Sequence, residues 1–244
     1  MSRVLRPSVA TVCRGLFRGQ WSIGRWAFPV IAVAAAVAIV VWASIGDPTK
    51  SIVGFSRQGM MWFPFSLSIA VAVGQVNVHV AMGRTRRTLG RAAVLAALAL
   101  SVVYAGGLVA LIQVERGVYA MAGWQHAVGD DLAFVSDTSQ VGLLFGEYLV
   151  TTATAHLCGL LCGITYYRFG GWVGTLTLPL TVGPLALVLA GMSADVPFLT
   201  GDLAVGTVGG GVLRAAVAAV VLAAVVVAFQ GILRSAPIRT APLI

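Results

Sequence analysis

Six long apolar runs dominate this sequence of 244 residues and constrain its fold more than any other feature. A helix that crosses the hydrocarbon core of a bilayer needs about 20 apolar residues, since each residue adds about 1.5 Å along the axis. Spanning helices are expected at residues 27–44, 60–82, 92–113, 141–167, 172–192 and 209–233. The sequence therefore predicts an all-α membrane protein in which residues 1–244 form a single transmembrane domain.

The composition argues against a soluble globular domain. Charged residues make up 10% of the chain and hydrophobic residues 59%, and the mean hydropathy is +0.94. A soluble domain carries about 25% charged residues. The net charge of +8 does not indicate a nucleic-acid partner, because the basic residues are divided among segments that flank the apolar runs.

Basic and acidic residues are sorted between the segments that connect the apolar runs. Arginines occupy the N-terminal segment, residues 83–91, the turn at 168–171 and the C-terminal tail, and none of these segments holds an acidic residue. Cytoplasmic loops of membrane proteins carry the excess of Lys and Arg. Both termini are therefore expected in the cytoplasm, which agrees with an even number of spans.

Residues 80–91, VAMGRTRRTLGR, form a strongly basic island between two predicted spans. Its candidate functional residues are Gly83, Arg84, Thr85, Arg86, Arg87 and Arg91. Two interpretations remain open. The segment is either a docking element for a cytosolic protein or only a charge cluster that fixes the orientation of the chain.

Residues 9–26 have a basic face and an apolar face when they are placed on a helix, at about 100° per residue. The arginines are Arg14, Arg18 and Arg25, and the apolar residues opposite them are Val12, Leu16 and Ile23. This pattern predicts an amphipathic helix on the cytoplasmic membrane surface, with its arginines toward lipid phosphates. A disordered basic tail is the alternative.

Polar side chains inside the second span are candidates for a translocation path or for helix contacts. Ser68, Gln75 and His79 fall on one stripe of that span. Polar residues in a span usually face protein or a water-filled cavity, so the stripe predicts a cavity lining or a contact with a partner helix. For His79 alone, a side chain that reaches the lipid headgroups is the alternative.

The fourth span is the most polar, and its polar residues are Glu147, Thr151, Thr152, Thr154 and His156. Glu147 and Arg214 each lie roughly 8–10 Å inside the outer end of their predicted spans. Because a charge inside a membrane needs a partner, we predict that these two residues pair, within one chain or across a dimer. The alternative is that both side chains extend to the outer surface.

The same span holds Gly159 and Gly163, a Gly-x-x-x-Gly pattern that predicts close packing of two helices. Cys158 and Cys162 lie one turn apart, and a helix interface is their expected place, with a metal site as the alternative. No cysteine falls in a predicted outer loop, so a disulfide framework is not expected.

Three further features concern the outer part of the chain. Residues 114–140 are expected to form a solvated acidic loop, with a metal site as the alternative because His126, Asp130, Asp131 and Asp137 lie there. Residues 193–208 are apolar but broken by Pro197 and several glycines, which predicts a re-entrant or interfacial hairpin. Prolines at 179 and 184 are expected to kink the fifth span.

Motifs for nucleotide binding and hydrolysis are absent from the sequence. Lys50 is the only lysine and follows Thr49, so the chain has no phosphate-binding Gly-Lys loop. Gly-x-Ser-x-Gly and His-Glu-x-x-His are also missing. The chain itself is expected to be neither an enzyme nor the holder of a cofactor, with an intramembrane enzyme that uses Glu147, His156 and His79 as the alternative.

The layout of spans and charges resembles the ABC exporter permeases of the type-two class. Members of that family have six spans, both ends inside, an N-terminal amphipathic helix and a short basic first cytoplasmic loop. Many actinobacterial members carry a Gly-x-[Ser/Thr]-Arg-Arg-like motif in that loop, and this chain reads Gly83-Arg84-Thr85-Arg86-Arg87. The composition, rich in Ala, Val and Gly and poor in Lys, also looks actinobacterial.

The resemblance implies a function and a set of partners. Residues 9–25 would be the connecting helix against an ATP-binding-cassette ATPase, and residues 83–91 the coupling element that docks into it. ATP and Mg would be bound by that separate subunit, and a second permease, identical or paralogous, would complete a multi-pass transporter in a bacterial plasma membrane. The exported compound would be hydrophobic or amphipathic, such as a drug, a lipid or a peptide-like molecule. A non-catalytic assembly or sensor subunit that docks a cytosolic protein is the competing interpretation.

Overall fold

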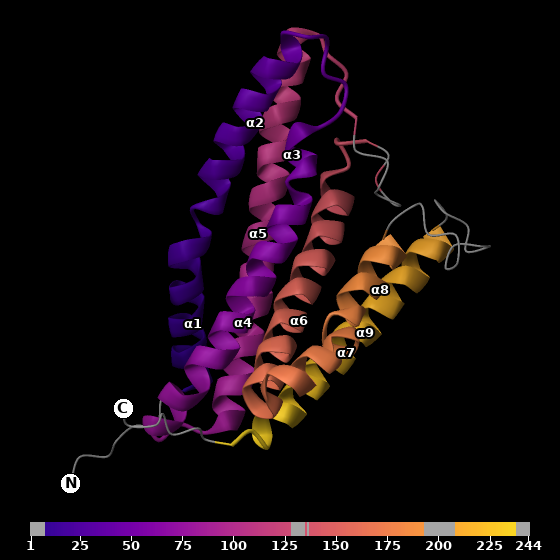
Figure 1. The fold of residues 1–244 in the computed structure, drawn as a ribbon. Helices are drawn as coiled ribbons and strands as arrows, with labels where there is room; N and C mark the ends of the chain where they lie inside the picture. Colours follow the sequence, from indigo (N-terminus) through magenta and orange to yellow (C-terminus); the bar gives the residue numbers. More distant parts are fainter. Residues whose placement is uncertain (1–7, 128–134, 136, 193–207, 238–244) are drawn as a thin grey trace.

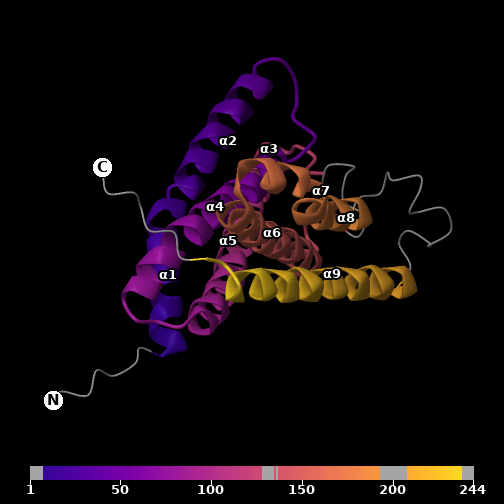
Figure 2. The ribbon, with the colours of Figure 1, turned by 60° about the horizontal axis from the view of Figure 1, so that its bottom comes forward.

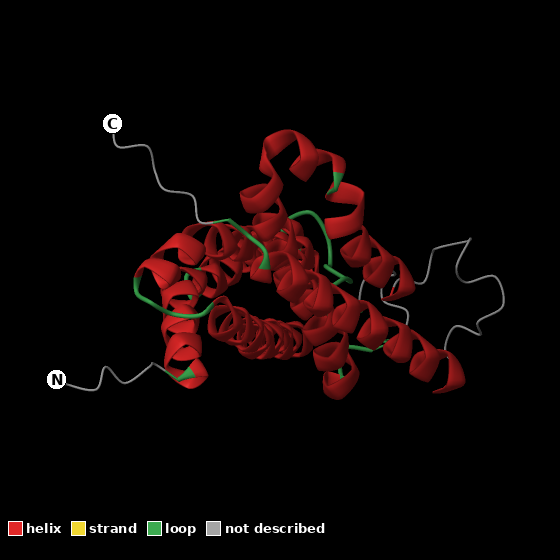
Figure 3. Ribbon diagram, turned by 90° about the horizontal axis from the view of Figure 1, so that it is seen from below, coloured by secondary structure: helices red, strands yellow, loops and turns green. Residues whose placement is uncertain are grey.

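The computed structural model describes residues 8–127, 135, 137–192 and 208–237. The elements are α1 (Val9–Gly24), α2 (Ala27–Ala43), α3 (Ile52–Phe55), α4 (Arg57–Ala81), α5 (Arg86–Ala122), α6 (Val141–Leu176), α7 (Leu178–Thr181), α8 (Gly183–Met192) and α9 (Val208–Arg234). Figure 3 draws these ranges as helices and loops without any strand. The prediction of an all-α protein is therefore confirmed.

Five helical segments in the described ranges are long and apolar enough to cross a bilayer: Val9–Ala43, Ile52–Ala81, Arg86–Ala122, Val141–Leu176 and Gly211–Arg234. The fifth predicted span, residues 172–192, is instead divided among the end of α6, α7 and α8. The chain leaves the helical conformation at Gly170, where φ is 82°, and helices begin anew around Pro179 and Pro184. Proline lacks the N–H that a helix interior needs, so the predicted kink is confirmed. Six full spans remain a prediction.

Helices α1 and α2 follow one another almost without interruption. Arg25 and Trp26 between them keep right-handed helical angles, with φ of −58° and −73°. The predicted amphipathic helix is present as α1, which packs along α5 and buries Val12 and Leu16. Its orientation on a membrane surface remains a prediction, because Figure 1 shows α1 running beside the bundle rather than across its end.

Helix α6 occupies the centre of the bundle. Helices α1, α2, α4 and α5 lie on one side of it, and α8 and α9 lie on the other (Figure 1, Figure 2). Every residue from 151 to 165 is buried. A polar side chain in a spanning helix is tolerated when it faces protein. The threonines and His156 of the fourth predicted span therefore lie in protein and not in lipid.

Helices α4 and α6 approach each other closely because two glycines of α6 face the backbone of α4. A methyl group on Gly159 would lie 2.3 Å from the Phe65 carbonyl oxygen, and one on Gly163 would lie 2.7 Å from the Ile69 carbonyl oxygen. Those distances are far below van der Waals contact. The Gly-x-x-x-Gly pattern therefore serves the close packing that the sequence predicts.

Replacement of Gly159 by alanine tests this packing. Alanine favours a helix over glycine by up to about 1 kcal/mol, but overpacking costs about 1–3 kcal/mol. We expect Gly159→Ala to lower the free energy of unfolding, measured by denaturant titration of the purified protein in detergent micelles.

Gly146 of α6 is the matched control, because a methyl group there would meet no other atom within 4 Å. Gly146→Ala should leave the free energy of unfolding unchanged or raise it slightly. Equal effects of the two substitutions would contradict the close approach at Gly159.

Candidate functional site

The basic island is mostly helical. Helix α4 ends at Ala81 and α5 begins at Arg86, so the connection is only residues 82–85. Thr85 caps α5, and its hydroxyl oxygen accepts a hydrogen bond of 3.2 Å from the backbone N–H of Thr88. The expectation of a loop over 83–91 is therefore corrected: Arg86, Arg87 and Arg91 lie on the first turns of α5. Positive charges are unfavourable at a helix N-terminus, so the cap and the burial of Leu89 set this boundary.

The four arginines of the island have different environments. Arg84 turns back toward α4, where its Nη1 lies 3.3 Å from Nε2 of His79. Arg86 donates a hydrogen bond of 2.9 Å to the Arg234 carbonyl oxygen at the end of α9. Arg87 and Arg91, one turn apart on α5, are exposed. Two of these arginines thus make contacts inside the fold and two face outward.

The end of α9 is held in place by side chains from two helices, α5 and α6. Besides Arg86, Arg168 of α6 donates to the hydroxyl of Ser235. The hydroxyl of Tyr167 lies 2.5 Å from Oδ1 of Asn77 and 3.0 Å from the Pro237 carbonyl oxygen. Figure 1 shows α1 beginning and α9 ending at this end of the bundle. We call it the arginine end, because it holds Arg84, Arg86, Arg87, Arg91, Arg168 and Arg234.

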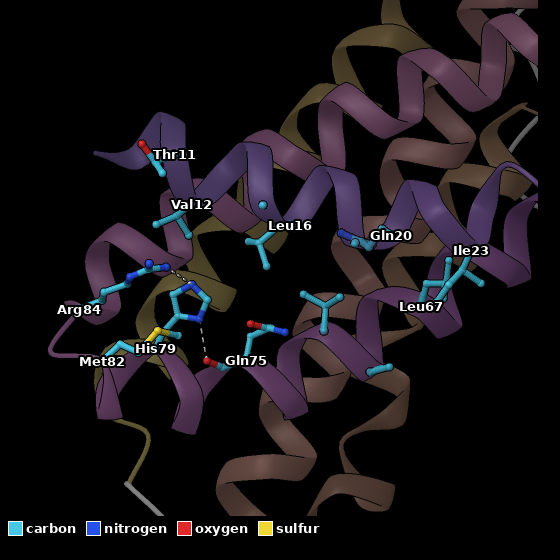
Figure 4. Close-up of a pocket in the computed structure, with 14 residues that line it drawn as sticks. Thr11, Val12, Leu16, Gln20, Ile23, Leu67, Gln75, His79, Met82 and Arg84 are labelled. Carbon is cyan, nitrogen blue, oxygen red and sulfur yellow. Dashed lines mark hydrogen bonds between the residues drawn. The ribbon is translucent and has the colours of Figure 1, made fainter. Parts of the chain in front are cut away.

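A groove of about 520 Å³ separates α1 from α4, and we call it the α1–α4 groove (Figure 4). It unites residues from three separate sequence predictions: Leu16 and Ile23 of the amphipathic helix, Gln75 and His79 of the polar stripe, and Arg84 of the basic island. Two residues of the polar stripe, Gln75 and His79, therefore line a cavity, as predicted. Ser68, the third, is buried and faces Gly159 of α6. The basic face of α1, Arg14, Arg18 and Arg25, is exposed.

Hydrogen bonds define the protonation of His79. Its Nδ1 lies 3.0 Å from the Gln75 carbonyl oxygen, which can only accept, so Nδ1 carries the proton. Arg84 can only donate, so Nε2 of His79 is the acceptor. The imidazole is therefore neutral, and the positive charge at this end of the groove belongs to Arg84.

The partner of Glu147 differs from the predicted one. Its Oε1 lies 3.3 Å from Nη2 of Arg57, and the side chains of Arg57 and Glu147 are only 12% and 2% exposed. Arg214 donates instead to the Gly191 carbonyl oxygen of α8, at 3.1 Å. Within one chain, Glu147 therefore forms an ion pair with Arg57, and its pairing with Arg214 across a dimer stays a prediction. The reason is that α4 begins at Arg57 and places this arginine in a helix, whereas the predicted span begins only at residue 60.

Buried polar groups also organise the end of the bundle opposite the arginine end. Glu115 of α5, which is 3% exposed, accepts hydrogen bonds from the Ser51 hydroxyl at 2.5 Å and from the backbone N–H groups of Ile52 and Val53 at 2.7 and 3.1 Å. His126 contacts the same carboxylate at 3.1 Å. A carboxylate at the start of α3 satisfies N–H groups that have no partner within the helix. Sequence reasoning missed this role, because the only local signal was an acidic residue just after an apolar run.

Residues 114–140 were expected to form a solvated acidic loop, but residues 114–122 belong to α5 and the side chain of His126 is buried, whereas Asp137 is exposed. His126 is enclosed between Glu115 and the Thr138 hydroxyl, 2.9 Å from its Nδ1. Asp137 is exposed, and a hydrogen bond from the Ser139 backbone N–H holds the pKa of its carboxyl below the usual value. Asp130 and Asp131 lie outside the described residues, as does the segment 193–207. In the described ranges, no three His, Cys, Asp or Glu side chains are grouped for a metal ion.

His156 lies beside a serine in the core of the bundle. Its Nδ1 is 3.1 Å from the Ser101 hydroxyl and 3.0 Å from the Thr152 carbonyl oxygen. Because that carbonyl can only accept, Nδ1 carries a proton and is not free to take one from Ser101. Both side chains are fully buried. The contact therefore lacks the features of a serine–histidine catalytic pair. The neighbouring Cys158 and Cys162 are buried and free of disulfides.

Comparison with known protein families, with curated proteins and with solved structures found no match to this chain.

A double-mutant cycle tests the ion pair of Glu147 and Arg57. Removal of one member of a buried pair leaves the other charge unbalanced. The losses of unfolding free energy in the two single variants should therefore not add up to the loss in the double variant. We expect a coupling energy of about 1–3 kcal/mol between Glu147→Gln and Arg57→Gln. The measurement is the free energy of unfolding in detergent for the wild type, both single variants and the double variant.

A second cycle, with Glu147→Gln and Arg214→Gln, serves as the comparison. Its coupling energy should be the smaller of the two. The opposite order would restore the pairing that the sequence suggested.

Proposed function

We propose that this chain is the permease subunit of an ATP-driven exporter, a transporter in which a separate subunit binds and hydrolyses ATP. The observation that carries the proposal is the exposed pair Arg87 and Arg91 on the first turns of α5. Thr85 caps the start of this helix, and the neighbouring Arg86 donates a hydrogen bond to the end of α9. A rigid, cationic surface of this kind suits docking of a cytosolic protein that presents acidic groups.

The charge distribution supports docking at this end. The described acidic residues are Asp47, Glu115, Asp137 and Glu147, and none of them belongs to the arginine end. A positive surface without nearby carboxylates leaves its charge available to a partner. Under the positive-inside rule this end faces the cytoplasm. We therefore infer that the protein is a multi-pass component of a bacterial plasma membrane, with both termini in the cytoplasm.

Two features of the chain suit a permease that depends on a partner. The sequence has no phosphate-binding loop of its own, so ATP and Mg would be bound on the partner subunit. Apolar side chains remain exposed on α2, α8 and α9, among them Val37, Val40, Leu187, Val220 and Val227. Large apolar surfaces of this kind face lipid or another protein. A second permease chain against them would complete the transporter, and the exported compound would be hydrophobic or amphipathic.

Substitution of the exposed arginines tests the docking surface. We expect Arg87→Ala/Arg91→Ala to insert into the membrane at wild-type levels. The double variant should lose at least tenfold in the amount of ATPase subunit that co-purifies from the native membrane. The readouts are the identity of the co-purified proteins and the ATP hydrolysis of the purified complex.

Two further variants make the result specific. Arg116→Ala removes a charge at the opposite end of α5 and should retain the ATPase. Arg86→Ala, unlike Arg87→Ala/Arg91→Ala, should lower the thermal stability of the chain, because it removes the hydrogen bond to the end of α9. If no ATP-binding protein co-purifies with the wild type, the exporter proposal fails. A different cytosolic protein held by Arg87 and Arg91 would identify an assembly or sensor subunit.

A further inference from the structure

The α1–α4 groove contains a buried polar group without a partner. Gln20 of α1 is 5% exposed, lines the groove, and its Oε1 has no hydrogen-bond partner in the part of the chain that the structure describes. A buried polar atom left unsatisfied costs about 1–3 kcal/mol. An amide offers two N–H donors and one acceptor. The unpartnered Oε1 of Gln20 therefore indicates an occupant that brings a hydrogen-bond donor into the groove.

Two glycines keep the groove open on the α1 side. Gly15 and Gly19 line it, and a methyl group on either would meet no atom within 4 Å. Glycine inside a helix costs up to about 1 kcal/mol relative to alanine. No tight helix contact requires glycine at these two positions, in contrast to Gly159 on α6. Their effect is to widen the space between α1 and α4.

One end of the groove is cationic. Arg84 lines it and is oriented by the neutral imidazole of His79. Of its guanidinium nitrogens, only Nη1 has a recorded hydrogen bond within the described ranges, so further N–H donors remain for a ligand. None of the residues that line the groove is acidic. A guanidinium in this setting is suited to a phosphate, whose oxygens accept two parallel hydrogen bonds.

The lining changes from polar to apolar along the groove. On α4 it runs from His79 and Gln75 near the arginine end to Val71, Ala70 and Leu67 farther in. These 12 residue steps correspond to about 18 Å of helix. Leu16 and Ile23 of α1 continue the apolar wall, and Gln20 is the polar side chain between them (Figure 4). The groove thus has the polarity of a molecule with an anionic head and a hydrocarbon chain.

We propose that the α1–α4 groove binds an anionic glycerophospholipid from the leaflet at the arginine end. The phosphate contacts Arg84, and one acyl chain lies between α1 and the inner part of α4. Ester oxygens of the lipid accept hydrogen bonds from the amide N–H groups of Gln75, and a glycerol hydroxyl donates to Oε1 of Gln20. The arginine end lies at the headgroup level of the cytoplasmic leaflet, where anionic lipids are attracted to basic residues. This inference rests on the groove and on the membrane orientation inferred above, and it does not depend on the proposed transport.

Native mass spectrometry of the full-length chain in detergent tests the proposal, with phosphatidylglycerol and phosphatidylcholine as probes. We expect one phosphatidylglycerol to bind at least tenfold more tightly than phosphatidylcholine. Arg84→Gln should abolish this preference. Gly19→Leu should remove the tight site for both lipids by filling the groove, and its fold can be checked by circular dichroism and gel filtration.

Arg18→Gln is the matched control, since it removes one charge from the exposed face of α1 outside the groove. It should keep the phosphatidylglycerol affinity within about twofold, because exposed charges interact weakly through solvent. Equal losses in Arg84→Gln and Arg18→Gln would mean diffuse attraction to the whole surface and would overturn the proposal. Tight binding that survives in both Gly19→Leu and Gly15→Leu would overturn it as well. The proposal would also be overturned if Gly19→Leu changed the oligomeric mass of the protein without changing its lipid binding, because a second chain would then be the occupant of the groove.

Discussion

The approach of α4 to α6 at Gly159 and Gly163 is the contact on which the rest of the structure depends. A spanning helix has no hydrophobic force to hold it against its neighbours, so association relies on close van der Waals contact. Because α4 reaches the backbone of α6 on one side, and α8 and α9 cover the other, α6 is enclosed. The enclosure accounts for the threonines, His156 and Glu147 in a segment that lipid would not accept.

Arginines that look alike in the sequence perform different tasks in the fold. Arg86 and Arg168 hold the end of α9, Arg84 points into the α1–α4 groove, and Arg87 and Arg91 remain on the surface. The positive-inside rule applies to all of them and describes only which side they occupy. The proposed docking surface and the proposed lipid site therefore use separate members of one charge cluster.

The apolar runs were sufficient to predict the long helices, because a bilayer demands about 20 apolar residues in sequence. The run at 172–192 was less informative, since Gly170 and the prolines divide it. Partners of buried charges were beyond sequence reasoning: Arg57 and Glu147 are 90 positions apart, and only the packing of α4 on α6 joins them. The boundary at Arg86 was within reach, because Thr85 is a favourable residue to begin a helix.

Helix α5 has 37 residues in one unbroken stretch, so it extends for about 55 Å. The hydrocarbon core of a bilayer is only about 30 Å thick. The helix therefore projects from the core and carries Arg87 near one end and Glu115, with the loops bound to it, near the other. No proline lies in it, and its backbone stays helical through Gly106 and Gly107. Helix α5 is therefore one continuous element between the exposed arginines at one end and the buried Glu115 cluster at the other.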